Sequence, residues 1–346
     1  MLFSITGVVG IGGIAVALDH YITTHIQRKG GEERLVFRLE APYGSVELRP
    51  GVVSGDVATV EMLADDANAH NISTSYSVRN GSIGMLRVGV GTDEGMRSSP
   101  PLAMWYAKSG FVTASAPVPE SDQGSLMLHS PVHFTMPPIE PNFGYYYPPR
   151  VTRISTDAGT SVIPASSAGT RIHLTKDLPT DLVANLGFGE STLDLTGLQL
   201  TNAMIETGAS KAYIFCNQTN SQNLRNCSVR AGIGQCIFTG ISNLNADRFA
   251  FRGALGSYHL GFDGHLTHNL DVVVEIGLGM CTLSIPPTTA RVQVFFEDGL
   301  LSSFSFPGLA VRRDGYASSP GFDKSTSPIL TLHLSSGAGK ISVNYH

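Results

Sequence analysis

One short phrase returns several times between residue 161 and the C-terminus, and it constrains the fold more than any other feature. Each copy joins an apolar strand to Gly-x-Gly or Gly-Ala-Ser, and an alternating strand follows. The small residues at the equivalent place in the copies are Gly189, Ser210, Gly234, Gly256, Gly279 and Gly339. The first five lie about 21 to 24 residues apart. A fixed period of about 20–50 residues is typical of a repeat architecture.

The glycines of this phrase predict a β-solenoid, in which successive coils stack on one another. Glycine tolerates positive φ, so Gly-x-Gly allows a tight corner between two strands. Corner residues must be small because stacked coils lie only about 4.8 Å apart. Val272, Val274 and Ile276 would then point into a shared core while their neighbours point out. The alternative is an antiparallel sandwich with glycine turns, because several of these strand pairs could also form hairpins.

The charge content narrows the classes of partner. Charged residues make up 15% of the chain, against about 25% in a typical soluble domain. A surface with so few charges suggests that part of it lies against a membrane or another protein. The net charge of −5 argues against nucleic acid, which requires a basic face.

The first 27 residues are predicted to form a single transmembrane anchor. Leu2 to Leu18 carry no charge, and at about 1.5 Å per residue this run is slightly shorter than the roughly 30 Å hydrocarbon core. Residues up to about 25 would extend the helix, with Tyr21 as an aromatic residue at the interface. The small residues in this helix, some of which would allow close packing on another helix, are Gly7, Gly10, Gly13 and Ala17.

A cleaved secretory signal is the alternative for this segment, with Ala15-Val-Ala17 as the cleavage site. No basic residue precedes the apolar run, and the first ones, Arg28 and Lys29, follow it. The positive-inside rule therefore places the bulk of the chain in the cytoplasm, with the periplasm as the alternative side.

Three regions are expected after the anchor. Residues 28–90 form an N-terminal β region, in which Asn80-Gly81 predicts a hairpin, although this stretch could equally be an early, divergent coil. Residues 91–150 are an insertion rich in proline and aromatic residues, and residues 151–346 form the β-solenoid repeat domain.

The insertion is a candidate interface with a partner protein. Its prolines exclude regular structure, and its aromatic content is too high for a solvated linker. The aromatic residues predicted to contact a partner are Trp105, Phe143, Tyr145, Tyr146 and Tyr147. The alternative is that these rings pack against the solenoid of the same chain.

Several of the repeated phrases resemble a known family. Asn185–Leu198, Thr207–Ser210, Leu260–Gly264 and Gly277–Pro286 are similar to the toast-rack and adhesin-like β-solenoid families. In bacteria such domains form the C-terminal part of cell-wall-stress proteins that begin with membrane helices. The resemblance implies a right-handed β-helical fold, an envelope setting and no catalytic residues. The single apparent anchor and the proline-rich insertion depart from the family pattern.

The sequence offers little for catalysis or metal binding. His265 and His268 are weak candidates for a metal site, because structural zinc normally needs four ligands. Gly337-Ala-Gly-Lys340 lacks the first glycine and the Ser or Thr of a phosphate-binding loop. No catalytic residue and no cofactor are therefore predicted. Whether Cys216 and Cys227 form a disulfide is left open.

These features predict a non-enzymatic, single-pass protein of a bacterial inner membrane. It would be a scaffold or accessory subunit that binds other membrane subunits, and its N-terminal helix would contact the bilayer. An energy-converting assembly, respiratory or photosynthetic, is the expected host. A sensor of envelope stress or an adhesin-like binding module is the alternative. A polysaccharide-active β-helix enzyme is the third hypothesis, and it would require paired carboxylates in register.

Overall fold

The structure is a computed structural model of the chain, and it describes residues 21–52, 55–63, 72–90, 151–153, 162–164, 169–297, 301–312, 315–324 and 326–346. The chain divides into two compact units, one of residues 1–94 with 166–346 and one of residues 95–165. In the second unit the described strands are β7 (Val151–Arg153) and β8 (Val162–Pro164), which pair antiparallel. All other strands belong to the first unit.

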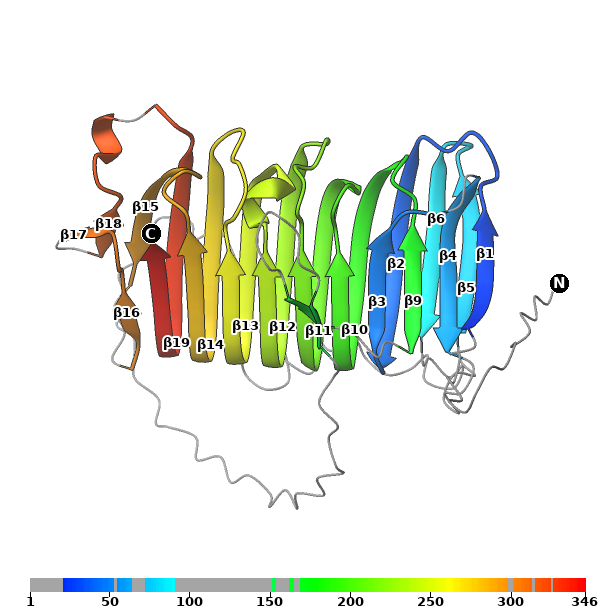
Figure 1. Cartoon of the computed structure of the whole chain (residues 1–346), viewed down its shortest axis with the longest axis horizontal. Coiled ribbons are helices and arrows are strands. Elements are labelled where there is room, and N and C mark those ends of the chain that lie inside the picture. Colours follow the sequence, from blue (N-terminus) through cyan, green and yellow to red (C-terminus); the bar gives the residue numbers. More distant parts are fainter. Residues whose placement is uncertain are drawn as a thin grey trace, which may run out of the picture. The chain divides into compact units, whose positions relative to one another are not determined.

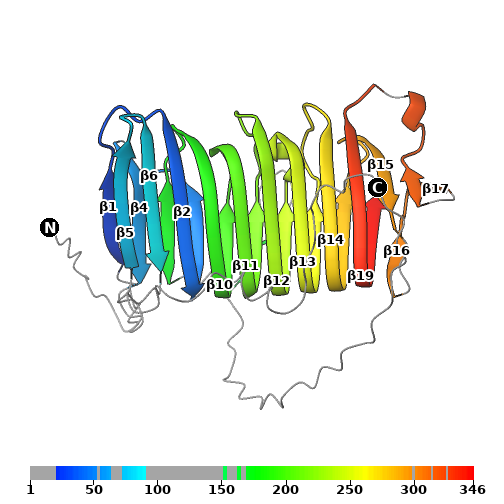
Figure 2. The ribbon, with the colours of Figure 1, turned by 180° about the vertical axis from the view of Figure 1, so that it is seen from behind.

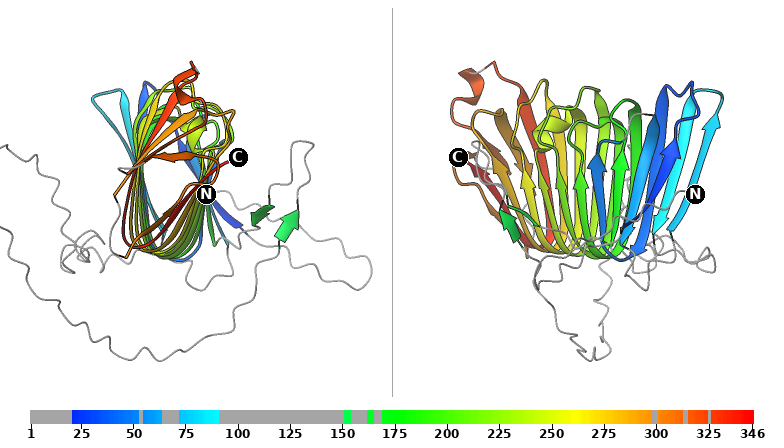
Figure 3. Two further views of the ribbon diagram at one scale, coloured as in Figure 1. Left: turned by 90° about the vertical axis from the view of Figure 1, so that its left-hand side faces the viewer. Right: turned by 45° about the vertical axis from the view of Figure 1, so that its right-hand side comes forward.

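The first unit is built on one 17-stranded sheet that bends back on itself into two walls (Figure 3). Its long strands pair in parallel, each with the next coil, along their whole length (Figure 1). They are β10 (Pro179–Asp194), β11 (Gln199–Phe215), β12 (Leu224–Thr239), β13 (Ala246–Gly261), β14 (Leu270–Ile285) and β19 (Ile329–Tyr345). The architecture is thus mainly β and has the stacked coils expected of a β-solenoid. The handedness of the coil stays a prediction.

Each long strand runs down one wall, bends at its glycines and runs up the other wall. We call the half before the bend the first wall and the half after it the second wall. The bends form the corner edge, at the bottom of Figure 1, and the connections between coils form the opposite loop edge. The 3₁₀ helix η2 (Ile241–Leu244) lies at the loop edge.

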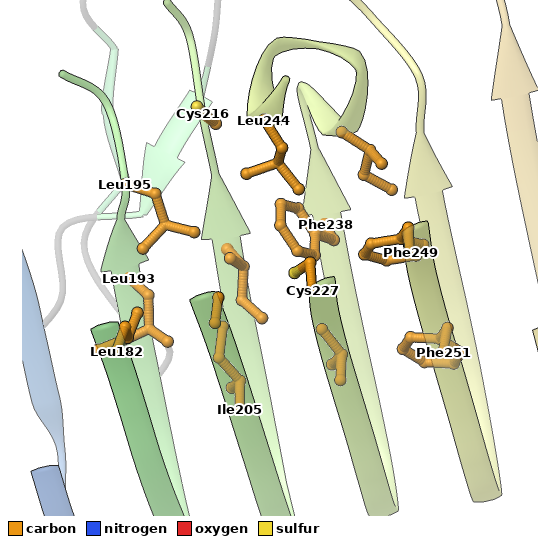
Figure 4. Close-up of a cluster of buried hydrophobic side chains, with 14 of the residues drawn as sticks. Leu182, Leu193, Leu195, Ile205, Cys216, Cys227, Phe238, Leu244, Phe249 and Phe251 are labelled. Atoms are coloured by element: carbon orange, nitrogen blue, oxygen red, sulfur yellow. The ribbon is translucent and has the colours of Figure 1, made fainter. Parts of the chain in front are cut away.

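The core fills the space between the walls. Inward residues of the two walls alternate with outward ones, so that Val272 and Val274 face Cys281 and Leu283 across the interior and all four are buried. Large rings occupy the middle coils, where Phe238 and Phe249 pack edge to face with centroids 5.6 Å apart (Figure 4). Each coil contributes one layer, so the core is continuous along the stack.

The N-terminal end continues the stack with shorter strands. β2 (Arg34–Tyr43) and β3 (Val46–Pro50) pair with the two halves of β10, so the described strands of the N-terminal region and of the repeat domain share one sheet. β6 (Ile83–Val90) pairs with β2 on the first wall, and β9 (Thr170–Leu174) pairs with β3 on the second wall. Figure 2 shows the first wall with β2, β6 and β5 at this end.

The outermost strands at this end are antiparallel. β5 (Ile72–Arg79) forms the predicted hairpin with β6 through Asn80 and Gly81, which both have positive φ. β4 (Asp56–Leu63) pairs with β9, and β1 (Tyr21–Gln27) pairs with β4. The two alternatives predicted for this region, a hairpin and an early coil, are therefore both present. β6 is the second strand of the hairpin and also part of the stack.

The C-terminal end has an inverted order of strands. β15 (Arg291–Phe296) and β16 (Ser303–Ser305) pair with β19, which itself lies against β14. β19, the last strand of the chain, thus lies between β14 and the strands β15 and β16, which precede β19 in sequence. β17 (Ala310–Arg312) and β18 (Tyr316–Ser318) extend this end with antiparallel pairings, and a 3₁₀ helix, η3 (Phe322–Lys324), follows.

The prediction that the N-terminal helix extends to about residue 25 is wrong for residues 21–25. Tyr21–Gln27 is a strand that pairs with β4, with a shift of register between Ile26 and Gln27. Its four β-branched residues suit a strand, and the edge of the sheet supplies the hydrogen-bond partners. Among the described residues no helix is long and apolar enough to cross a membrane. The uncharged run from Leu2 to Leu18 lies outside the described residues, so the anchor stays a prediction.

Candidate binding surface

The corner edge owes its shape to glycines that cannot be replaced without a clash. Gly234 and Gly279 have φ of 126° and 118°, in the region that favours glycine. A Cβ atom on Gly279 would lie 2.0 Å from the carbonyl oxygen of Gly256 in the previous coil, and one on Gly234 would lie 2.2 Å from that of Ser210. The backbone of one coil therefore rests directly on the backbone of the next.

The six small residues singled out in the sequence form one column along this edge. Gly189 pairs with Ser210, Ser210 with Gly234, and Gly234 with Gly256. Gly256 pairs in turn with Gly279, and Gly279 with Gly339. The separation of 60 positions between the last two does not interrupt the column, because β19 lies next to β14.

The residue between the two small positions points away from the core. These residues follow one another in register and form what we call the corner row: Tyr43, Phe188, Ala209, Ile233, Leu255, Leu278 and Ala338. The large members are about half exposed, with Ile233 at 56% and Phe188 at 52%. The rings of Tyr43 and Phe188 stack with centroids 5.6 Å apart. A continuous line of apolar side chains thus faces outward from the edge of the solenoid.

The neighbours of the corner row are small or polar. Glycine or alanine precedes every member of the row except Tyr43, which follows Pro42. The column after the corner glycines is mixed, with Lys211, Gln235 and the exposed Met280 among its members. Because the small residues add no bulk beside it, the row stands out as a ridge and not as the floor of a groove.

Ion pairs lie beside the corner row on the first wall. Arg230 Nη1 lies 2.8 Å from Glu206 Oε1, and Arg252 Nε lies 2.7 Å from Glu275 Oε2. Each of these residues is three positions before the corner-row residue of its own coil. Such exposed pairs contribute little stability, but they place a charged belt next to the apolar row.

Neither the cavity at the corner nor the two predicted histidines form a site for a small substrate or a metal. The cavity beneath the corner at Gly44 and Gly189 has room for about one water molecule. No group of three or more potential metal ligands lies together in the described parts of the chain. His268 is 3.2 Å from Asp247, and the backbone amide of His265 donates to Asn243. The two histidines suggested as weak metal ligands therefore have ordinary loop contacts.

The four cysteines are free and buried between the walls. Burial raises the pKa of Cys227 and Cys236 to about 12 and that of Cys216 to about 11. The thiolate is the reactive form, so these thiols are poor nucleophiles at neutral pH. The question left open by the sequence is answered, since Cys216 and Cys227 are not paired.

Two sets of predicted site residues lie outside the described residues. They are the partner-interface residues Trp105, Phe143, Tyr145, Tyr146 and Tyr147, and the anchor residues Gly7, Gly10, Gly13 and Ala17. Tyr21, predicted to anchor the helix, is the first residue of β1. The roles of both sets stay predictions.

The corner row itself was not recognised from the sequence, although the signal was present. The glycines of the repeated phrase predict the corner, whereas the direction of the residue between them does not follow from strand alternation. A large apolar residue that stands between two small residues in successive coils would have indicated an outward row, once the corner was taken to be convex.

The first coils after the insertion are similar to a known family. Residues 154–239, which include β9 to β12, match the family model described as the N-terminal domain of toast_rack, DUF2154. The predicted resemblance to the toast-rack family is confirmed. The toast-rack match thus covers the first coils after the insertion. No curated protein matches the chain in sequence.

Two solved structures are also similar to the chain. One is a candidate cell adhesion protein from Clostridium sporogenes, with 12% identity and a TM-score of 0.40 over 95% of this chain and 100% of that one. The other is a candidate adhesin from Bacteroides fragilis, with 10% identity and a TM-score of 0.35 over 94% of this chain and 97% of that one.

Proposed function

We propose that this protein is a non-enzymatic, adhesin-like binding module of the bacterial envelope, and that the corner row is its binding surface. The row carries the proposal because the fold does not require large apolar residues there. Ala209 and Ala338 occupy the same place in their coils, so a small residue is sufficient for the corner. A contiguous line of half-exposed apolar side chains on a protein surface usually marks an interaction site.

The arrangement of carboxylates favours binding over catalysis. A polysaccharide-active enzyme would need two carboxylates facing each other across a substrate. On the first wall Glu206, Glu275 and Asp181 each pair with an arginine of a neighbouring coil. These acids are occupied by arginine partners, which leaves the third hypothesis without a candidate pair among them.

The accessory-subunit hypothesis gives way to this alternative. The toast-rack match supports a module of the envelope and offers nothing for an energy-converting assembly. The uncharged run from Leu2 to Leu18 is the remaining reason to expect attachment to a membrane, and it is compatible with a binding module. Attachment to other membrane subunits stays a prediction that depends on the aromatic insertion.

Labelling in the native envelope tests the proposal. The variant Ile233→Cys places a reactive thiol on the corner row, where the chain already accepts alanine in two coils. Thr219→Cys is the matched control, because Thr219 is exposed in the connection between β11 and β12 at the loop edge. The native thiols react slowly because they are buried. Each variant is labelled with a water-soluble maleimide in isolated envelopes and after purification in mild detergent, followed by exchange into detergent-free buffer.

We expect the thiol at position 233 to react several-fold more slowly in the envelope than in the purified protein, and the thiol at position 219 to react equally in both. Equal rates at position 233 in the two samples would overturn the proposal, since a binding surface must be covered where its partner is present.

A further inference from the structure

We infer that the partner of the corner row is a lipid bilayer surface, on which the solenoid lies lengthwise with its corner edge in the interface. This inference rests on the proposed function, because it names what covers the same row. Four features of the corner edge support a lipid surface over a protein partner: its shape, its area, its charged border and the place where the chain enters it.

The shape of the edge suits a fluid surface. The row lies on the outside of the bend between the two walls (Figure 3). Apart from Pro42 and Ser210, the residues that flank it have no side chain or only a methyl group, so the row forms a convex ridge. A protein partner would need a complementary groove to cover such a ridge. Lipid chains need no preformed groove, because they rearrange around inserted side chains.

The area of the row is too small for a stable second copy. Six coil steps of about 4.8 Å separate Tyr43 from Ala338, so the row is roughly 29 Å long. Its large side chains are only half exposed and present on the order of 500 Å² in total, while a standard interface buries about 800 Å² on each partner. Insertion of side chains into a membrane interface requires no such minimum area, since even weak and reversible binding adds to any other attachment to the membrane.

The ion-paired belt sets a depth that fits the interface. Glu206, Arg230, Arg252 and Glu275 lie three residues from the row, which is at most about 10 Å at roughly 3.3 Å per residue. Interfacial elements bury their apolar face about 5–10 Å into the boundary between headgroups and acyl chains. With the row at that depth, the belt would lie among the headgroups, where charged side chains stay solvated.

The chain enters the solenoid at the same edge. Tyr21 pairs with Leu63, and the neighbouring Met62 pairs with Thr170, which in turn pairs with Val46 just after the corner at Gly44. β1 therefore begins at the corner edge, as Figure 1 shows. The uncharged run from Leu2 to Leu18 ends only three residues before β1. A membrane attachment of that run would hold the corner edge close to the bilayer.

The charge of the protein points to apolar insertion. The net charge is −5, so anionic lipids would repel the protein as a whole. Binding of the row should therefore occur on phosphatidylcholine, which carries no net charge, and should change little with salt. This distinguishes the inference from electrostatic attachment.

Depth-dependent quenching on pure lipid tests the inference. The full chain with Ile233→Cys, labelled with a fluorophore, is reconstituted into phosphatidylcholine vesicles that contain a nitroxide on the lipid acyl chain. Leu278→Cys provides a second site on the row, and Thr219→Cys provides the control at the loop edge. We expect the lipid-borne quencher to reduce fluorescence at positions 233 and 278 several-fold more than at position 219, at low and at high salt.

Equal quenching at positions 233 and 219 would overturn the lipid inference. If position 233 is nevertheless protected in native envelopes, the proposed binding function survives and the partner is a protein or another envelope component. If the thiol at position 233 is protected from the maleimide in vesicle-free solution, and this protection rises with protein concentration, the occupant is a second copy of the chain. Protection at every concentration without vesicles would identify a segment of the same chain. Each of these three results would reject lipid as the partner.

Discussion

The two edges of the solenoid close the same coils by different means. At the corner edge the carbonyl oxygen of one coil fills the space that a Cβ atom of the next would need, as between Gly256 and Gly279. At the loop edge buried asparagines bridge the coils, and Asn220 donates to the carbonyl oxygens of Leu200 and Leu244 at 2.7 and 3.2 Å. The corner edge depends on the absence of side chains, whereas the loop edge depends on particular ones.

This difference decides what each edge can tolerate. The corner edge excludes any side chain at its glycines but accepts alanine, leucine, isoleucine or phenylalanine at the outward position. The loop edge also includes acidic groups near the starts of the strands, such as Asp181 and Glu32. Changes of side-chain volume should therefore damage the first edge, and changes of hydrogen bonding or pH should damage the second.

The largest effect is expected for Gly279→Ala. The new methyl group would lie 2.0 Å from the carbonyl oxygen of Gly256 at a φ of 118°, so backbone strain and a backbone clash add. We expect the free energy of unfolding to fall by roughly 3–5 kcal/mol, measured by urea denaturation. Gly321→Ala is the control, since Gly321 also has positive φ but nothing within 4 Å, and it should cost about 1–2 kcal/mol. Equal losses at both sites would show that coil contact at the corner is unimportant.

Asn220→Ala should have the next largest effect. The amide group of Asn220 also accepts from the backbone N–H of Leu200 at 3.1 Å, so the substitution leaves several buried backbone groups without partners. A loss of roughly 2–4 kcal/mol in the free energy of unfolding is expected. Asn217→Ala, at an exposed position of the same connection, should cost much less. If the two variants were equally stable, the asparagines would not be what closes the loop edge.

Acid should weaken the loop edge before the corner edge. Burial acts to raise the pKa of Asp181, but hydrogen bonds from Thr201, Asn202 and Arg34 outweigh it and hold the pKa below its usual value. The folded state therefore favours the ionised carboxyl. Its stabilisation is fully present above the pKa in the unfolded chain, about 3.9, and is lost as the pH falls through the lower folded value.

Asp181→Asn should remove part of this acid dependence. We expect the free energy of unfolding of the variant to fall less between pH 5 and pH 2 than that of the wild type, in urea titrations at each pH. Asp323→Asn, at an exposed position near the C-terminal end, should leave the dependence unchanged. An identical pH profile for wild type and Asp181→Asn would contradict the prediction.

Glu32 should contribute in the same direction. Burial acts to raise its pKa, but the hydroxyl of Tyr76, 2.6 Å away, and backbone amides that include that of Lys29 donate hydrogen bonds that lower it on balance. Both acids lie near the loop edge, so acid should weaken this side of the molecule through them.

The smallest effect on stability is expected on the corner row. Ile233→Ser changes a side chain that is 56% exposed, so the free energy of unfolding should change by less than about 0.5 kcal/mol. Ile276→Ala, at a buried position next to the corner, should cost about 2–5 kcal/mol. Thermal unfolding of the two variants checks the difference. A loss at position 233 as large as that at position 276 would mean that the row packs against the protein's own chain.

The sequence by itself determined the repeat, the small residues at its corners and the alternation of the walls. These depend on local rules, since positive φ requires glycine and side chains alternate along a strand. The hairpin at Asn80-Gly81 is local in the same sense, and the structure has it. The order of strands at the two ends could not be read in this way, because β19 is placed next to β14 by pairing over 60 residues.

Only the tertiary structure decided where the corner residues face and what residues 21–25 become. Strict alternation from Val272, Val274 and Ile276 would place Leu278 in the core. The bend at Gly279 shifts the phase, so that Cys281 is the next buried residue and Leu278 points outward. Tyr21–Gln27 looked like the end of a helix, but an unpaired edge at β4 supplied hydrogen-bond partners that local sequence cannot show. Both outcomes depend on which backbone lies alongside, and that is settled by the stacking of coils.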